Sequence, residues 1–294
     1  MDINYELYKV FYYVATTLSF SEASKQLFIS QSAVSQAIKA LEKKLDQTLF
    51  IRSTKRVQLT PEGEILLRHV EPAMNLIKRG ESQLIDANSS GGQIRIGASD
   101  TICRYFLVPY LEKFHKKFPN AHIKVTNQTS LKSVALLENG QVDLIVINYP
   151  NSNLSNLYSV KKIGQFRDLF AANHTYSQLK NRKVSLKELT EYPILMLERE
   201  STTSEFLHNL FQQNQLDLVP EIELSSNDLL CDLAKIGLGI AFIPDYCIPE
   251  HNDDLFFVDI KEKLPSRELA IVHNNHIPTS KVVQEFLALF QEPL

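Results

Sequence analysis

Hydroxyl side chains gather at three places along the chain where an apolar segment gives way to an expected helix. They follow the segments QIRIGAS, HIKVTNQ and PILML, each of which has the composition of a β-strand. In open α/β sheets, ligands bind beyond the carboxyl ends of the strands, where helix N-termini direct free amide groups at anions. Each hydroxyl alone is an ordinary helix cap, but the three sets together favour a site for a small polar or anionic molecule. The candidate residues are Ser99, Thr101, Thr129, Ser130, Thr202 and Thr203, with Ser201 and Ser204 beside the last two.

A second set of polar side chains lies on one face of the helix expected after Ser30, whose hydroxyl can cap it. Val34, Ile38, Leu41 and Leu45 have the spacing of the buried stripe of that helix. The opposite face offers short hydroxyl side chains, an amide that can pair bidentately with adenine, and lysines that can reach phosphates, as a helix in a DNA major groove requires. A merely solvated face fits the same residues equally well. These residues are Ser32, Ser35, Gln36, Lys39 and Lys43.

The elements around this helix favour the first interpretation. Two shorter helices are expected before it, one with an apolar stripe from Ile3 to Val14 and one capped by Ser19. After it, residues 49–52 and 56–59 can form a small hairpin whose tip holds residues 53–55. A basic hairpin beside a helix-turn-helix is typical of a wing that reaches the DNA backbone or the minor groove.

The same region resembles a known family. From Ser19 to Leu45 it reads SFSEASKQLFISQSAVSQAIKALEKKL, it continues with LFIRSTKRVQLTPEGE, and it closely resembles the signature of LysR-type transcriptional regulators. The resemblance implies a winged helix-turn-helix whose partner is double-stranded operator DNA. The residues that it places at the DNA are Gln31, Ser32, Ser35, Gln36 and Lys39 on the helix, with Arg52 and Lys55 on the wing.

The chain departs from the family pattern at two positions. It carries Gln36 where many members carry arginine, which predicts an altered base preference. Asp46 stands where glycine is usual after the recognition helix, and aspartate can adopt the left-handed conformation that a helix end needs.

A long helix is expected next, because Thr60 and Pro61 supply an N-cap and a favoured first-turn proline. It runs towards Asn88, and Pro72 is expected to kink it or break it near Glu71. Its apolar residues form a short heptad seam, which predicts a dimer through this helix and is similar to the family's linker helix. A helix packed against its own domain is the alternative. The seam consists of Leu66, Val70, Ala73, Ile77 and Leu84, with Gly80 at the remaining step.

The remainder of the chain alternates strands and helices, which predicts a parallel α/β sheet. The resemblance to the effector domain of LysR-type regulators, itself similar to periplasmic solute-binding folds, implies two Rossmann-like lobes with the effector between them. It also implies that the chain crosses between the lobes near Lys161 and near Lys263. We therefore expect a winged helix-turn-helix over 1–60, a linker helix over 61–88, a hinge over 89–92 and an effector domain over 93–294. Lobe I would take about 93–161 and 266–294, and lobe II about 162–265.

Charge and cysteine content support this division. The net charge of the chain is −3, but basic residues outnumber acidic ones up to Thr60, and the rest of the chain is net acidic. The sequence therefore combines a small basic N-terminal region, as DNA binding requires, with a larger acidic region. The three cysteines include no CxxC pair, which fits a reduced protein. Cys103 lies near the expected entrance of the site, but no resolving cysteine adjoins it, and a small apolar filler is the preferred interpretation. His273 and His276 are only a weak metal pair, so no metal or other cofactor is expected.

The main competing interpretation is an enzyme or a solute-binding protein with an accessory head. The sequence contains no nucleophile elbow, Gly-rich phosphate loop or HExxH motif, and its start lacks the features of a signal peptide. A DNA architectural protein without an effector is a second alternative. We therefore expect a cytoplasmic, non-enzymatic regulator without a membrane segment, and the family similarity suggests dimers that pair into tetramers.

Overall fold

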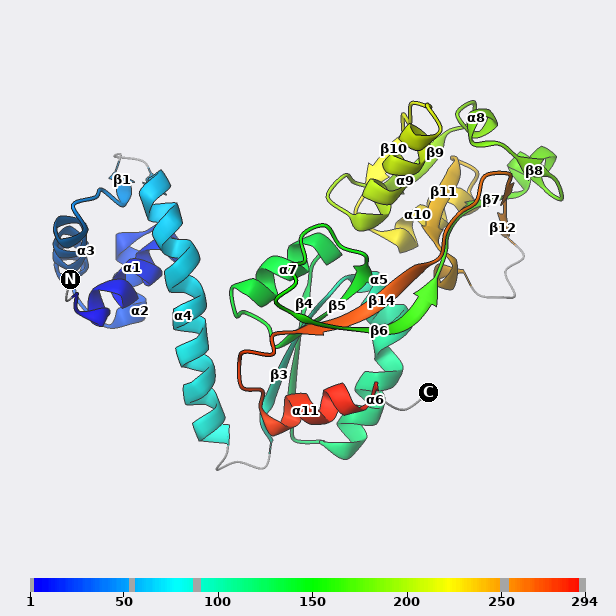
Figure 1. Cartoon of the computed structure of the whole chain (residues 1–294). Helices are drawn as coiled ribbons and strands as arrows, with labels where there is room; N and C mark the ends of the chain where they lie inside the picture. The colour runs from blue at the N-terminus through cyan, green and yellow to red at the C-terminus, as the bar shows by residue number, and fades with distance from the viewer. Residues whose placement is uncertain (1–2, 53–55, 87–90, 249–253, 291–294) are drawn as a thin grey trace. The chain divides into compact units, whose positions relative to one another are not determined.

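The computed structural model describes residues 3–52, 56–86, 91–248 and 254–290. The chain divides into two compact units, a smaller one formed mainly by residues up to Asn88 and a larger one formed mainly by the residues after it. Figure 1 shows the elements of both units. Within the described ranges, no helix is long and apolar enough to cross a membrane.

Three helices, each started by a polar side chain, build the core of the smaller unit. The Ser19 hydroxyl accepts a hydrogen bond from the Glu22 amide, and the Ser30 hydroxyl accepts one from the Ala33 amide, which confirms both predicted caps. Asp46 follows the third helix at a φ of 52°, in the expected left-handed conformation. Apolar side chains from all three helices meet in one buried cluster. The helices are α1 (Tyr5–Thr17), α2 (Phe20–Leu27) and α3 (Gln31–Leu45).

The predicted hairpin and long helix complete this unit. The strands β1 (Phe50–Arg52) and β2 (Val57–Leu59) pair antiparallel, and the expected wing tip, 53–55, lies outside the described residues. The helix α4 (Pro61–Asp86) begins after Thr60, whose hydroxyl accepts a hydrogen bond from the Gly63 amide at 3.0 Å.

Pro72 lies inside α4, which continues on both sides of it as a single helix. Of the two expected effects of Pro72, a kink or a break near Glu71, the break is therefore wrong. Side chains just before and after the proline pack against the core of the smaller unit: Val70 is buried and Met74 is partly buried there. This packing fixes the helix on both sides of the hydrogen bond that proline removes.

The two halves of the apolar seam of α4 lie in different environments. Leu66 and Val70 pack into the core of their own unit, as the alternative interpretation expects. Further along, Ile77 is 56% exposed and Leu84 is 73% exposed, so the second half of the seam lies at the surface.

The larger unit contains two five-stranded sheets, which we call lobe I and lobe II. Lobe I has the strand order β4-β3-β5-β14-β6. Two of its helices begin at Asp100 and Ser130, where the hydroxyls of Ser99 and Thr129 accept hydrogen bonds from backbone amides of their first turns. The elements of lobe I are β3 (Gln93–Ala98), α5 (Asp100–Ile102), a π-helical turn (Cys103–Leu107), α6 (Val108–Lys117), β4 (His122–Asn127), α7 (Ser130–Glu138), β5 (Leu144–Tyr149), β6 (Ser159–Phe166), β14 (Arg267–His273) and α11 (Lys281–Ala288).

Lobe II has the strand order β10-β9-β11-β7-β12, with a separate two-stranded sheet of β8 and β13. Ser185 caps α8, since its hydroxyl accepts a hydrogen bond from the Glu188 amide. The elements of lobe II are β7 (Asp168–Ala172), a 3-10 helix (His174–Leu179), β8 (Lys183–Val184), α8 (Leu186–Leu189), β9 (Ile194–Leu197), α9 (Thr202–Gln213), β10 (Ile222–Leu224), α10 (Asn227–Lys235), β11 (Ile240–Pro244), a 3-10 turn (Asp245–Cys247), β12 (Phe256–Phe257) and β13 (Asp259–Ile260).

Both five-stranded sheets are mixed, so the expectation of a wholly parallel sheet is wrong. Four strands of each sheet run in one direction and one strand runs against them. The reversed strand is β14 in lobe I, between β5 and β6, and β7 in lobe II, between β11 and β12. The cause is the exchange of chain between the lobes: β6 leads out of lobe I and β14 leads back into it, side by side (Figure 1). Because β6 stays paired in the sheet of lobe I as far as Phe166, the first crossing comes after Phe166 rather than near Lys161.

Candidate functional site

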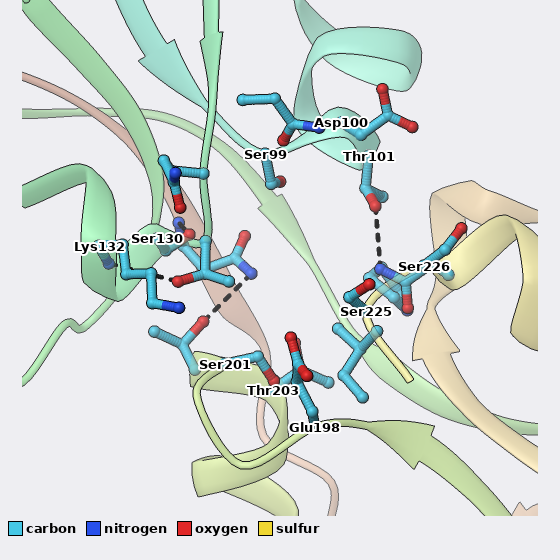
Figure 2. Close-up of a pocket in the computed structure, with 18 of the residues that line it drawn as sticks. Ser99, Asp100, Thr101, Ser130, Lys132, Glu198, Ser201, Thr203, Ser225 and Ser226 are labelled. Atoms are coloured by element: carbon cyan, nitrogen blue, oxygen red, sulfur yellow. Dashed lines mark hydrogen bonds between the residues drawn. The ribbon is translucent and has the colours of Figure 1, made fainter. Parts of the chain in front are cut away.

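A cavity between lobe I and lobe II brings the predicted hydroxyl side chains together, and Figure 2 shows them around one open space. Its volume is about 330 Å³, which suits a small molecule. Ser201 also lines the cavity, whereas Ser204 is not among its lining residues. All six candidate residues line it: Ser99, Thr101, Thr129, Ser130, Thr202 and Thr203.

Three helices, α7, α9 and α10, begin at the wall of this cavity. Ser201 Oγ accepts a hydrogen bond from the Ser204 amide at 3.1 Å, and Ser226 Oγ accepts one from the Leu229 amide at 3.3 Å. Each cap satisfies only one of the backbone donors that have no partner within the first turn of a helix. The remaining donors and the helix dipoles therefore favour negative charge in the cavity.

Two side-chain amides join the lobes across the cavity (Figure 2). Asn148, on β5, donates from Nδ2 to Thr202 Oγ1 at 3.3 Å, and Asn227, the first residue of α10, donates from Nδ2 to Thr101 Oγ1 at 3.0 Å. Neither amide was identified from the sequence. The one signal for Asn148 is its position directly after the apolar run of β5, where a polar side chain interrupts an otherwise buried strand.

Three charged side chains also line the cavity, namely Asp100, Lys132 and Glu198. Lys132 forms an ion pair with Glu200, which raises the pKa of Lys132, and the charge of Glu198 acts in the same direction. Among the described residues, neither the Asp100 nor the Glu198 carboxylate has a hydrogen-bond or ion-pair partner. The only ammonium group on the described lining therefore already has a carboxylate partner in this chain, in a pair whose side chains are 53% and 65% exposed.

A buried ion pair lies beside the cavity, between the two segments by which the chain passes from lobe to lobe. Asp168 is the first residue of β7 and Arg267 the first of β14, and their side chains are 0% and 5% exposed. Arg267 also donates to Thr203 Oγ1 at 3.1 Å, and its guanidinium lies over the rings of Phe166 and Phe206, 5.3 Å from each ring centre. Burial raises the pKa of Asp168, and the charge of Arg267 opposes that shift. Thr203 thus connects the cavity wall to this pair.

Cys103 does not line the cavity and packs against the core of lobe I. Burial, and secondarily the charge of Asp100, raises the pKa of its thiol to about 11. Since the thiolate is the reactive form, this environment favours a structural cysteine.

We expect Cys103 to react slowly with thiol reagents. At pH 8, a thiol with a pKa of about 11 is roughly one part in a thousand ionised, against roughly a quarter for an unperturbed cysteine. Alkylation of Cys103 by iodoacetamide, measured by peptide mass spectrometry, should thus be roughly two to three hundredfold slower than that of a free cysteine peptide. A rate within a few fold of the peptide would contradict this and reopen a redox role.

Metal-ligating side chains give no further site in the part of the chain that the structure describes. No group of three or more histidine, cysteine, aspartate or glutamate residues there could hold a metal ion. His273 ends β14, and burial lowers its pKa below the ordinary value.

The outer face of α3 presents the residues that the sequence places at DNA. Gln31, Ser32, Gln36 and Lys39 are exposed and Ser35 is half-buried. The opposite face is fixed in the core, because Val34, Ile38 and Leu41 of the predicted stripe are 0% exposed there and Leu45 is partly buried. Arg52 belongs to β1, and Lys55 lies outside the described residues.

Two family models match the chain over nearly its whole length. The "LysR substrate binding domain" matches residues 87–294, and "Bacterial regulatory helix-turn-helix protein, lysR family" matches residues 5–64. The chain belongs to the LysR family. It is a DNA-binding transcriptional regulator with a helix-turn-helix and a two-lobed substrate-binding domain, as the resemblance of its sequence implied.

Individual LysR-family proteins match along almost the entire chain. A protein of Phaeodactylum tricornutum named "Probable RuBisCO transcriptional regulator" is 29% identical over 93% of this chain and 91% of its own length. The "HTH-type transcriptional activator CmpR" of Synechocystis is 26% identical over 95% of this chain and 92% of its own length.

Solved structures share the fold. CbnR complexed with its target DNA has a TM-score of 0.67 at 18% identity, and covers 98% of this chain and 99% of its own. The regulatory domain of Synechocystis CcmR in complex with 2-PG has a TM-score of 0.62 at 19% identity, over 68% of this chain and 95% of that domain. At these identities the likeness concerns the fold, and it confirms the expected combination of a winged helix-turn-helix with a two-lobed α/β domain.

Proposed function

We propose that this LysR-family regulator reads a specific promoter sequence with the exposed face of α3. The residues in this role are Gln31, Ser32, Ser35, Gln36 and Lys39, with Arg52 and Lys55 of the hairpin at the phosphates or the minor groove. The observation that carries the proposal is a face of polar side chains that can reach base edges, opposite a stripe in which Val34, Ile38 and Leu41 are completely buried and Leu45 is partly buried. CbnR, which shares the fold, forms a complex with its target DNA.

We further propose that a small polar or anionic effector binds in the cavity between the lobes and modulates DNA binding. The proposed contacts are Ser99, Thr101, Thr129, Ser130, Thr202 and Thr203. Three helix N-termini at one cavity favour a ligand with negative charge. The CcmR regulatory domain, which shares the fold, was solved in complex with 2-PG.

The chain would then be organised as the sequence predicts, with a DNA-binding domain over 1–60, a linker helix over 61–88, a hinge over 89–92 and an effector domain over 93–294. We propose that it acts in the cytoplasm, without a cofactor and without an enzymatic activity of its own. In support, the curated relatives described above are named as regulators of transcription.

The proposal is tested by fluorescence anisotropy with labelled DNA from immediately upstream of the chain's own gene, against a scrambled duplex, across a salt series. We expect specific binding in the nanomolar range and a shift of the binding curve by an effector. Equal, weak binding to both duplexes would reject sequence-specific regulation and favour the α/β body as an enzyme or transport component.

We propose a dimer through α4, with pairing into tetramers. The second half of the predicted seam lies exposed on one face of this helix: Ile77 is 56% and Leu84 is 73% exposed. A second copy of the same face would cover them, as in a heptad seam.

Ile77→Glu is therefore expected to weaken the dimer by roughly a hundredfold or more, because it would bury an unpaired carboxylate in the interface. Sedimentation velocity at micromolar concentration measures the change from dimer to monomer. Ile236→Glu provides the control, since Ile236 is 72% exposed at the end of α10. If both variants remain dimeric, the interface lies elsewhere.

A further inference from the structure

We infer that the effector is a small zwitterion, with an ammonium group as well as an anionic group, as in an α-amino acid. This inference rests on the proposed effector site between the lobes and specifies the chemistry of its ligand. Two opposing electrostatic features of the cavity carry it.

The first feature attracts the anionic group. The helices α7, α9 and α10 begin at the cavity wall, and their first backbone amides point donors towards it. Ser130 and Thr202, the first residues of α7 and α9, lie on opposite lobes and both line the cavity. A carboxylate between them would accept backbone hydrogen bonds from both lobes at once.

The second feature opposes a purely anionic ligand. The lining holds two carboxylates, Asp100 and Glu198, and one ammonium group, that of Lys132. Lys132 is already paired with Glu200, and Glu198 also acts on its charge. A dianion would therefore meet two carboxylates whose charge no free cation on the described lining balances, whereas a ligand ammonium group would balance them.

Two buried amide oxygens on residues of the cavity wall also favour a ligand with an ammonium group. Asn227 is 5% exposed, and it uses its Nδ2 on Thr101, while its Oδ1 is inaccessible to solvent and has no partner among the described residues. Asn148 is arranged in the same way, with Nδ2 on Thr202 and Oδ1 without a described partner. An ionised carboxylate or phosphate only accepts hydrogen bonds, whereas an ammonium group has three donors and no acceptor. Both oxygens are inaccessible to solvent, so an ammonium group would reach them only if the two side chains turned towards the cavity, whereas an anion could not satisfy them in any orientation.

Neither feature alone selects a zwitterion. The helix N-termini would suit any carboxylate, and the acidic lining would suit any amine. An amino acid offers both groups a few bonds apart, which a cavity of about 330 Å³ can enclose.

The experiment uses the full chain and isothermal titration calorimetry. The probes are the proteinogenic amino acids, the matching acids that lack the amino group (succinate for aspartate, glutarate for glutamate), the matching amines that lack the carboxylate, and 2-phosphoglycolate. We expect at least one amino acid to bind, and removal of either its amino group or its carboxylate to weaken binding by about tenfold or more. Glu198→Gln should weaken the same amino acid by about tenfold or more, and should leave its acid without the amino group unchanged or bound more tightly.

A matched control separates this effect from a general loss of charge. Glu223→Gln removes an exposed carboxylate from β10 that does not line the cavity, and we expect it to bind as the unaltered chain does. If 2-phosphoglycolate or an acid without an amino group binds as tightly as any amino acid, or if Glu198→Gln changes nothing, the inference is overturned and the effector site stands. If no probe binds, or if Thr202→Val leaves all binding unchanged, the proposed effector site fails as well.

Discussion

Replacing Arg267 with alanine is expected to lower the free energy of unfolding by about 3–5 kcal/mol, because it leaves the charge of Asp168 buried without its partner. Asp168 is fully buried at the start of β7, and Arg267 is the cation that it contacts. The substitution also removes the donor to Thr203 and the guanidinium that packs over Phe166 and Phe206. Urea denaturation followed by circular dichroism measures the loss.

The loss should depend on pH with a defined sign. Burial already raises the pKa of Asp168 in the folded chain, and removing Arg267, which opposes that shift, raises it further. A folded-state pKa above the unfolded value means that the folded chain loses stability as pH rises above the ordinary carboxyl range. The loss in free energy of unfolding caused by Arg267→Ala should therefore be largest at neutral pH and smaller in mild acid, where Asp168 is protonated.

Two further variants distinguish a lost ion pair from lost packing. Asp168→Leu/Arg267→Met replaces both partners by apolar side chains, and it should recover most of the stability that Arg267→Ala loses. Arg104→Ala breaks an ion pair with Asp228 whose side chains are 63% and 27% exposed, and it should cost less than about 1 kcal/mol. If Asp168→Leu/Arg267→Met is as unstable as Arg267→Ala, packing of the guanidinium rather than its charge stabilises the contact between the starts of β7 and β14.

Local signals in the sequence predicted the ends of many elements. Ser19 and Ser30 cap the helices that they were expected to cap, because an N-cap depends on a side chain and an amide only three residues away. The six hydroxyl residues of the cavity could also be predicted, because each lies near the junction of a strand and a helix. The topology of an α/β domain brings such junctions together at one edge of the sheet.

Features that depend on distant partners could not be predicted in this way. β6 carries Lys161 and Lys162 and has no clear apolar alternation, and it is a strand because β14, about a hundred residues later, pairs with it. The amides of Asn148 and Asn227 acquire their importance from hydroxyls on the other lobe. Asp168 and Arg267 also depend on distant partners. In the sequence each has the character of an exposed charge, and only the fold brings the starts of β7 and β14 together so that the two side chains form a buried ion pair.

Gln36→Ala and Arg52→Ala are expected to weaken DNA binding in different ways. Gln36 is exposed on the outer face of α3, and an amide that pairs with adenine contributes about 1–3 kcal/mol of discrimination against the wrong base. Its loss should reduce the preference for the cognate duplex by roughly tenfold and leave binding to scrambled DNA unchanged. A phosphate contact by Arg52 carries no sequence information, so its loss should weaken both duplexes alike and reduce the salt dependence by about one unit of slope.

Anisotropy titrations of both variants against cognate and scrambled duplexes, each at several salt concentrations, separate the two effects. Lys183→Ala, on a strand of lobe II, is the control for a lost positive charge and should change neither duplex. If Gln36→Ala and Arg52→Ala both lower the salt slope and leave the preference intact, α3 holds the backbone only, and specificity must come from DNA shape. If only Gln36→Ala changes the preference for the cognate duplex, the amide of Gln36 reads the base sequence. Its base preference then differs from that of the arginine that many LysR-type regulators carry at this position.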